Sequence, residues 1–386
     1  MRKTVNIQLA STDQCTGCSA CASICPTESI SMKEDREGFL QPHIDTKTCI
    51  GCHKCEKTCP IITPIKIPTD FETQAYAAIN KDEAVRMRSS SGGMFHALAK
   101  WTIEQGGVVF GARFSENWEV VHDYTETIDG IEPFMRSKYV QSCIGETFKQ
   151  AKQFLDAGRQ VLFVGTPCQI GGLKAYLKKD YDNLLAVDFI CHGVPSPKVW
   201  REYLMGLKKE TKSKNILGVN FRDKENGWIN FQPVIETDSI VIRRDMMDNT
   251  FCRGFLKDVY QRKSCYGCQF KSIQRTADIT IADAWGVQYY LPKMYDDKGT
   301  SLLLIHSPKA FDMLKDFPSA ESVLIDLEQP LFHNPSLIQS VRKPKYKRWC
   351  FFRLFNLSNF QVASYFIDRD PIAVRIIRKI KRKIHI

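Results

Sequence analysis

Two short cysteine-rich runs near the N-terminus constrain this chain more than any other feature. Residues 15–26 read CTGCSACASICP, and residues 49–60 read CIGCHKCEKTCP, so the first phrase returns 34 residues later. Both runs follow the spacing C-x2-C-x2-C-x3-C-P. Eight thiols in so short a stretch predict a segment that folds around bound metal.

The spacing is that of bacterial two-cluster ferredoxins, where each 4Fe-4S cluster takes three cysteines from one run and the last cysteine of the other. This rule assigns cluster I to Cys15, Cys18, Cys21 and Cys59, and cluster II to Cys49, Cys52, Cys55 and Cys25. Gly17 and Gly51 would relieve crowding near the sulfides. A pair of structural zinc sites is the alternative, because C-x2-C also binds zinc. Two clusters in series predict electron transfer between a donor and an acceptor.

The chain after the second run has an α/β pattern. Residues 28–45, between the runs, predict a short helix and a polar hairpin, and residues 60–70 (PIITPIKIPTD) predict a linker. A strand is expected in QAYAAIN (74–80), a helix after SSSGG (89–93) and a second strand in VVFGARF (108–114).

The stretch RSSSGG at the start of that helix is a candidate phosphate cradle, because backbone N–H groups at a helix N-terminus attract anions. Its members are Arg88, Ser89, Ser90, Ser91, Gly92 and Gly93. Ser and Gly before a helix are also ordinary capping residues, so this pattern alone leaves both interpretations open.

Three further segments place cysteines where a third cluster could form. VLFVGTPCQIGG (161–172) predicts a buried strand, a turn with Cys168 and a helix, and LLAVDFICHG (184–193) predicts a strand that ends at Cys191 and His192. If these strands are parallel, both thiols emerge at one sheet edge. SCYGC adds Cys265 and Cys268, which completes a set of four.

Other roles for these residues stay open. Cys168 could be a nucleophile activated by His192, or any of the four could be an inert buried thiol. His192 could donate a proton near neutral pH. Asp283 could orient a polar group, and Trp285 is expected to pack in the core. Three cysteines outside any repeated spacing are expected to be inert: Cys143, Cys252 and Cys350.

The chain resembles the coenzyme F-420 hydrogenase/dehydrogenase beta subunit family, iron-sulfur flavoproteins that include plant 7-hydroxymethyl chlorophyll a reductase. The resemblance is carried, from about Cys15 to Gly286, by RSSSGGMFHALA, GGVVFGARF, RSKYVQS, VLFVGTPCQIGGL, LLAVDFICHGVPSP, FRDKENGW and SCYGCQFK...ADITIADAWG. It implies FAD in the body, a nearby 4Fe-4S cluster and two-electron reduction of a substrate or a deazaflavin. By motif position, the cluster would be held by Cys168, Cys191, Cys265 and Cys268. The flavin phosphates would lie near residues 89–93, with Lys138 and Tyr139 as further contacts.

Net charge and cysteine content indicate the cellular compartment and the classes of partner. Fifteen cysteines without an export signal favour reduced thiols and a cytoplasmic protein over a disulfide framework. The net charge is +11, and residues 337–386 alone hold 13 Lys and Arg against two acids. The rest is neutral, so we expect no nucleic-acid partner. The expected partners are a redox protein or ferredoxin and a small-molecule acceptor.

The last residues, PIAVRIIRKIKRKIHI (371–386), predict a basic amphipathic helix with Ala373, Ile376, Ile377, Ile380 and Ile384 on one stripe. Such a helix suits an anionic membrane surface, here the inner membrane, or packing on the body or on a partner protein. A role near lipid-linked intermediates of surface polysaccharide assembly would fit this charge.

We therefore expect a mixed α/β (α+β) chain with four parts. These are a two-cluster ferredoxin module (1–67), an N-terminal part of a flavin-binding body (68–155), a C-terminal part with the third cluster (156–325) and a basic tail (326–386). The predicted function is an oxidoreductase that passes electrons from the ferredoxin clusters through the third cluster to FAD, and on to coenzyme F-420 or another organic acceptor. A non-catalytic electron relay or membrane-docked adaptor, and a Cys168-dependent transferase, are the alternatives.

Overall fold

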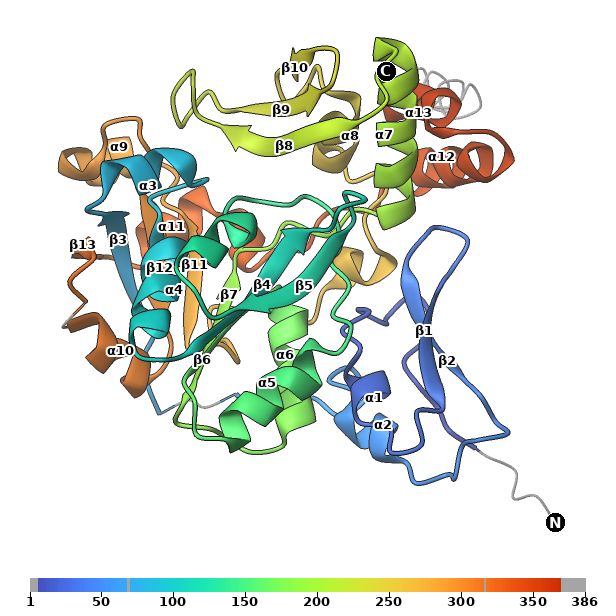
Figure 1. Cartoon of the computed structure of the whole chain (residues 1–386), viewed down its shortest axis with the longest axis horizontal. Coiled ribbons are helices and arrows are strands. Elements are labelled where there is room, and N and C mark those ends of the chain that lie inside the picture. The colour runs from blue at the N-terminus through green and yellow to red at the C-terminus, as the bar shows by residue number, and fades with distance from the viewer. Residues whose placement is uncertain (1–5, 68–69, 316, 369–386) are drawn as a thin grey trace, which may run out of the picture.

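The computed structural model describes residues 6–67, 70–315 and 317–368, and Figure 1 shows their arrangement. The N-terminal module contains two short helices and one hairpin: α1 (Ala20–Ser23), β1 (Ile30–Glu34), β2 (Leu40–Ile44) and α2 (Lys54–Thr58). The strands pair antiparallel, with Ile30 opposite Ile44. The polar hairpin is confirmed, but the short helix expected within 28–45 is wrong. Asp35 accepts hydrogen bonds from the N–H groups of Glu37 and Phe39, and this turn joins the two strands instead.

An eight-stranded mixed sheet forms the centre of the body, in the order β13-β3-β12-β11-β7-β6-β4-β5. Its strands are β3 (Gln74–Asn80), β4 (Val108–Phe114), β5 (Val120–Thr125), β6 (Val161–Val164), β7 (Leu184–Phe189), β11 (Ile279–Asp283), β12 (Ser301–Ile305) and β13 (Ala320–Ile325). Strands β4, β6, β7 and β11 are parallel neighbours, and the outer pairs are antiparallel. The parallel strands are largely apolar because helices cover both faces. The expected mixed α/β fold is confirmed.

Helices and short 3-10 turns connect and cover these strands. They are α3 (Glu83–Arg88), α4 (Met94–Glu104), η1 (Asp129–Phe134), α5 (Thr147–Asp156), α6 (Pro167–Leu177), η2 (Lys263–Gly267), α9 (Val287–Tyr290), η3 (Pro292–Met294), α10 (Pro308–Lys315), α11 (Glu328–His333) and η4 (Pro335–Leu337). The strand expected at 74–80, the helix after residues 89–93 and the strand at 108–114 are all present as β3, α4 and β4.

A second layer lies against the parallel sheet, at the top of Figure 1. It contains a three-stranded sheet in the order β10-β9-β8 and four helices. The elements are α7 (Pro197–Thr211), β8 (Ile216–Asp223), β9 (Gln232–Thr237), β10 (Val241–Arg243), α8 (Thr250–Leu256), α12 (Lys345–Leu357) and α13 (Phe360–Asp368). Trp200, Phe251 and Phe351 lie in its aromatic core, and all three are fully buried.

The ferredoxin module packs against the body through its two short helices, which lie beside α5 and α6 (Figure 1). Cys18 and Ala20 belong to the same buried core as Phe148, Ile170 and Leu173. The first cysteine run is therefore part of the body's hydrophobic core rather than a separate surface loop.

No helix within the described ranges is both long and apolar enough to cross a membrane. The amphipathic helix expected at 371–386 lies outside the described residues. The predicted domain boundaries stay a prediction, although strands from both predicted parts of the body, such as β4 and β6, pair in one sheet.

Candidate metal centre and cofactor site

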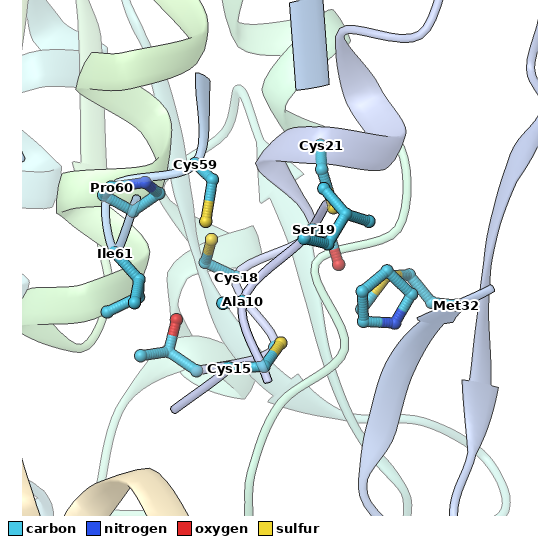
Figure 2. A pocket seen from close by; sticks show the side chains of 13 residues that line it. Ala10, Cys15, Cys18, Ser19, Cys21, Met32, Cys59, Pro60 and Ile61 are labelled. Atoms are coloured by element: carbon cyan, nitrogen blue, oxygen red, sulfur yellow. The ribbon is translucent and has the colours of Figure 1, made fainter. Parts of the chain in front are cut away.

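The first cavity in the module is lined by the four thiols that the spacing rule assigns to cluster I. Its lining includes Cys15, Cys18, Cys21 and Cys59 together with apolar residues such as Leu9, Met32 and Ile61, and the empty space, including the part open to solvent, is about 360 Å³. Figure 2 shows these cysteines around the space, with the Cys18 and Cys59 sulfur atoms turned toward each other. Cys59 comes from the second run, so the exchange of the last cysteine between runs is reproduced by the geometry.

The second cavity holds the complementary set. It is lined by Cys49, Cys52 and Cys55 of the second run and by Cys25 of the first, and its empty space, including the part open to solvent, is about 310 Å³. The backbone N–H of Ser29 donates to the Cys25 sulfur at 3.3 Å. Hydrogen bonds of this kind to cysteine sulfur are a feature of cluster-binding loops because they stabilise thiolate charge.

The donor set in the first cavity fits an iron-sulfur cluster chemically. Burial, with smaller contributions from the nearby Cys15 and Cys59, raises the pKa of the Cys18 thiol to about 11. Burial likewise raises the pKa of Cys21. Four thiolates crowded in an apolar cavity are unfavourable on their own, and bound iron would supply the compensating positive charge.

In the described part of the chain, no group of three or more His, Cys, Asp or Glu side chains has the spacing to hold a single metal ion. A zinc site needs all four sulfurs at about 2.3 Å from one ion. A 4Fe-4S cube spaces its ligands more widely, because each cysteine binds a different iron.

The four body cysteines converge as the parallel strands predicted. Cys168 is the second residue of α6, directly beyond β6, and Cys191 follows β7, which pairs parallel with β6. Pro167 at the first helical position and the capping box of Thr166 and Gln169 fix this turn. Cys265 lies in η2 and Cys268 directly follows it.

Electrostatic coupling shows that these thiols are mutual neighbours. Burial raises the pKa of Cys191 and of Cys265 to about 12, and it raises the pKa of Cys168 as well. Each of the six pairs among Cys168, Cys191, Cys265 and Cys268 interacts, always in the direction that opposes ionisation. Two cations act on Cys191, those of Lys271 and Arg275. The arrangement therefore fits a negatively charged cluster with four thiolates.

The nucleophile interpretation of Cys168 is weakened by this geometry. Catalytic thiols have a lowered pKa, whereas burial and the neighbouring thiols raise the pKa of Cys168. The imidazole of His192 lies 2.8 Å from Asp258 through its Nε2 and packs edge-on against Phe255.

The body thiols and the first cysteine run are in contact. Gly172, four residues after Cys168 on α6, packs so closely on Cys18 that an added Cβ would lie 2.9 Å from its sulfur. Cys18 also contributes to the raised pKa of Cys168. The cavity of cluster I is therefore next to the body thiols.

The predicted phosphate loop lies between α3 and α4, beside residues 136–139. Gly93 caps α4 with φ of 84°, and an added Cβ on Gly92 would lie 2.5 Å from the Ala78 carbonyl oxygen. The Ser90 hydroxyl accepts a hydrogen bond from the backbone N–H of Ser137 at 2.9 Å. Arg88 forms an ion pair with Glu132.

Several polar groups of this loop already have partners within the protein. The Gly92 N–H donates to the Ser301 hydroxyl at 3.0 Å, Ser91 donates to the Thr300 carbonyl, and Ser89 donates to the Val85 carbonyl. Hydrogen bonds within the protein therefore account for part of this motif, as expected if these Ser and Gly residues serve the start of the helix rather than a phosphate.

Lys138 and Tyr139 extend from this loop toward the second layer. Lys138 Nζ donates to the carbonyl of Met135 at 2.6 Å, and burial lowers the pKa of this amine to about 7. The ring of Tyr139 stacks on Phe255 at 4.8 Å, the same ring that contacts His192. Residues predicted from separate motifs thus form one continuous region.

Asp283, at the end of β11, forms a bidentate ion pair with Arg222, whose side chain is buried. Trp228 also donates to Asp283, and its ring stacks on Trp285 at 4.8 Å. Trp285 thus packs between aromatic and cationic side chains, close to its expected role.

The remaining thiols lie apart from these sets: Cys252 is fully buried in the second layer, and Cys143 and Cys350 are half-buried. Sequence reasoning missed Arg262, whose guanidinium contacts Cys15. In the sequence, only its position three residues before Cys265 could have pointed to Arg262.

Comparisons with known proteins agree with this geometry. Residues 14–61 match the 4Fe-4S dicluster domain, and residues 158–329 match the family described as the C terminus of the coenzyme F420 hydrogenase/dehydrogenase beta subunit. These matches support an iron-sulfur, electron-transfer, oxidoreductase-like protein. Its module is similar to 4Fe-4S dicluster domains, part of its body is similar to the F420 hydrogenase/dehydrogenase beta subunit, and the resemblance seen in the motifs is confirmed.

Among solved structures, a chain of the xenon-derivatized F420-reducing NiFe hydrogenase complex from Methanosarcina barkeri is similar. The two chains share 13% identity over 72% of this chain and 99% of that chain, with a TM-score of 0.44. A likeness at this level says nothing of activity. No curated protein sequence matches this chain.

Proposed function

We propose that this protein is an iron-sulfur flavoprotein oxidoreductase. Electrons would enter at the ferredoxin module, pass a third 4Fe-4S cluster held by the four body cysteines, and reach FAD. The acceptor would be a deazaflavin such as coenzyme F420, or another organic molecule. One observation carries the proposal: Cys168, Cys191, Cys265 and Cys268 converge beside the cavity of cluster I.

The difference in exposure between the two runs supports entry of electrons at the second run. Cys52 in the second run is exposed, and the neighbouring Ile50 is 65% exposed, whereas Cys18 in the first run is buried. A redox partner protein or ferredoxin would dock over Ile50, because electron transfer needs a short path to the cluster and exposed apolar side chains favour protein contact. Cluster I, next to the body thiols, would receive the electrons from cluster II.

The flavin would lie along the region from Arg88 to Tyr139. FAD would supply the step that converts single electrons into a two-electron transfer. Residues 88–93 and Lys138 would hold its phosphates, since a phosphate next to Lys138 would favour the charged amine that burial now disfavours. His192, oriented by Asp258, is the predicted proton donor.

A relay without flavin is the second candidate function. The hydrogen bonds that Ser89, Ser91 and Gly92 make within the protein favour it, because groups already satisfied are less available to a phosphate. In this case the body would pass electrons to a partner protein that holds the acceptor site.

Iron and flavin content of the anaerobically purified full chain test the proposal. Three 4Fe-4S clusters predict about twelve irons per chain together with bound FAD. Cys168→Ser should lose about four irons, while the matched variant Cys350→Ser, at a thiol outside all three sets, should keep them all. About eight irons without flavin in the unmodified chain would reject the flavoprotein.

We also propose that the C-terminal region contacts an anionic membrane surface. The basic tail itself lies outside the described residues, but α12 before it exposes Tyr346, Trp349 and Leu357, and Arg353 stacks on Trp349. Aromatic and basic side chains together suit a lipid interface. Sedimentation with vesicles containing anionic lipid should recover the full chain, and equal recovery with neutral vesicles would contradict the electrostatic part.

A further inference from the structure

Arg262 connects the first cysteine run to the body. It is fully buried, and its guanidinium donates to the carbonyl oxygens of Cys15 at 2.7 Å and Leu40 at 2.8 Å. A third bond goes to the Gln141 amide oxygen at 3.0 Å, and Nη2 also lies 3.6 Å from the Cys15 sulfur. One cation thus reaches both the backbone and the sulfur of a predicted cluster I ligand.

The backbone of Arg262 leads directly to the body thiols. Its N–H donates to the Val194 carbonyl at 2.9 Å, and its carbonyl accepts from the Cys265 N–H at 3.0 Å. Cys265 in turn packs beside Gly193, where an added Cβ would lie 3.4 Å from the Cys265 Cβ. Arg262 therefore contacts predicted ligands of two clusters at once.

Arg262 is a buried cation with no carboxylate partner in the described part of the chain. None of the ion pairs found among the described residues includes it, whereas nearby Lys263 pairs with Asp13 and buried Arg348 pairs with Glu37. A buried guanidinium is costly unless a negative charge offsets it. A 4Fe-4S cube with four thiolate ligands is a net anion, and it would lie in the cavity that Cys15 lines.

At the corresponding position of the second run, no described residue takes the place of Arg262. An added Cβ on Gly17 would lie 2.7 Å from Arg262 Nη1, so the guanidinium rests against this loop. The corresponding Gly51 has no other described atom within 4 Å of the same position. The cation therefore acts on one cluster of the pair.

We propose that Arg262 is a positioning residue that raises the reduction potential of cluster I above that of cluster II. Positive charge and N–H to sulfur hydrogen bonds favour the more negative, reduced cluster, and both are supplied by this side chain. The inference rests on the proposed function, because it takes Cys15 as a cluster ligand. Electrons that enter at the exposed second run would then pass from the cluster of lower potential to the cluster of higher potential.

A redox titration of the full chain, followed by electron paramagnetic resonance, tests this role. Arg262→Gln should shift the 4Fe-4S signal of cluster I to lower potential and leave that of cluster II unchanged, and Arg262→Lys should shift the cluster I signal by less. Arg201→Gln is the matched control, because Arg201 also joins module and body, through Glu34 and Glu119, but contacts no cysteine among the described residues.

Potentials at the wild-type value in both Arg262 variants would overturn the proposal, as would an equal shift in Arg201→Gln. If Arg262→Gln does not retain its iron, Arg262→Lys decides by the same criterion. Failure of the proposed function would look different, since the unmodified chain would then lack bound flavin and about four of its twelve irons, while the potentials of clusters I and II could still be compared.

Discussion

The two cysteine runs have the same cysteine spacing but differ in their surroundings. Residues 16–20 of the first run are buried, whereas residues 52–54 of the second are exposed. Their backbones match closely, with φ of 69° at Gly17 and 67° at Gly51, and φ of 63° at Ser19 and 55° at His53. The repeat therefore fixes how each loop turns, and the body decides which loop becomes an internal contact.

In the proposed function, this difference would give the two clusters different roles. The second run can meet an outside redox partner because its loop faces solvent. The first run cannot, since α5, α6 and Arg262 cover it. In the proposed function, a module with repeated ligand spacing would thereby have an entry side and an exit side for electrons.

The largest expected effect separates Cys18→Ser from Cys52→Ser. Each should lose about four irons per chain, because each removes one ligand of a 4Fe-4S cluster. Cys18→Ser should also destabilise the fold by about 1–3 kcal/mol more, since a hydroxyl without a partner would be left in the core beside Phe148. Iron analysis and thermal unfolding measure the two effects. Equal loss of stability in both variants would mean that the two runs contribute equally to the packing of the fold.

Removal of iron by a chelator should proceed in two steps. The cluster of the exposed second run should be lost on the order of tenfold faster, as expected if local opening of the two loops differs by about 1.4 kcal/mol. The decay of cluster absorbance follows the loss. Cys52→Ser should lack the fast phase, and a single phase in the unmodified chain would break the distinction.

The smallest expected effect compares Gly17→Ala with Gly51→Ala. Both positions have positive φ, so each alanine should cost about 1 kcal/mol. At residue 17 the methyl group would also press on Arg262, adding about 1–3 kcal/mol of overpacking. Thermal unfolding of the two variants gives the difference. Identical shifts of the melting temperature in the two variants would show that Arg262 moves aside without loss of stability.

Local sequence patterns predicted the parts of the site that depend on spacing or strand direction. The exchange of Cys25 and Cys59 between runs follows from the repeat, and the meeting of Cys168 with Cys191 follows from parallel β6 and β7. These relations need no knowledge of distant contacts.

What the sequence could not show depends on side chains far apart in the chain. Arg262 lies 247 residues from Cys15, and no periodicity links them. The short helix expected within 28–45 failed for a local reason, because Asp35 caps a turn in competition with helix formation. The packing of the module on α6 was equally invisible, because it joins segments that share no sequence pattern.

Electron entry into the body tests the central claim most directly. The full chain would be mixed anaerobically with a reduced ferredoxin, and flavin absorbance followed in the stopped-flow instrument for the unmodified chain, Cys52→Ser and the control Cys350→Ser. We predict that flavin reduction in Cys52→Ser is largely lost, while Cys350→Ser behaves as the unmodified chain. Flavin reduction at the same rate in all three would contradict an entry through the exposed second run.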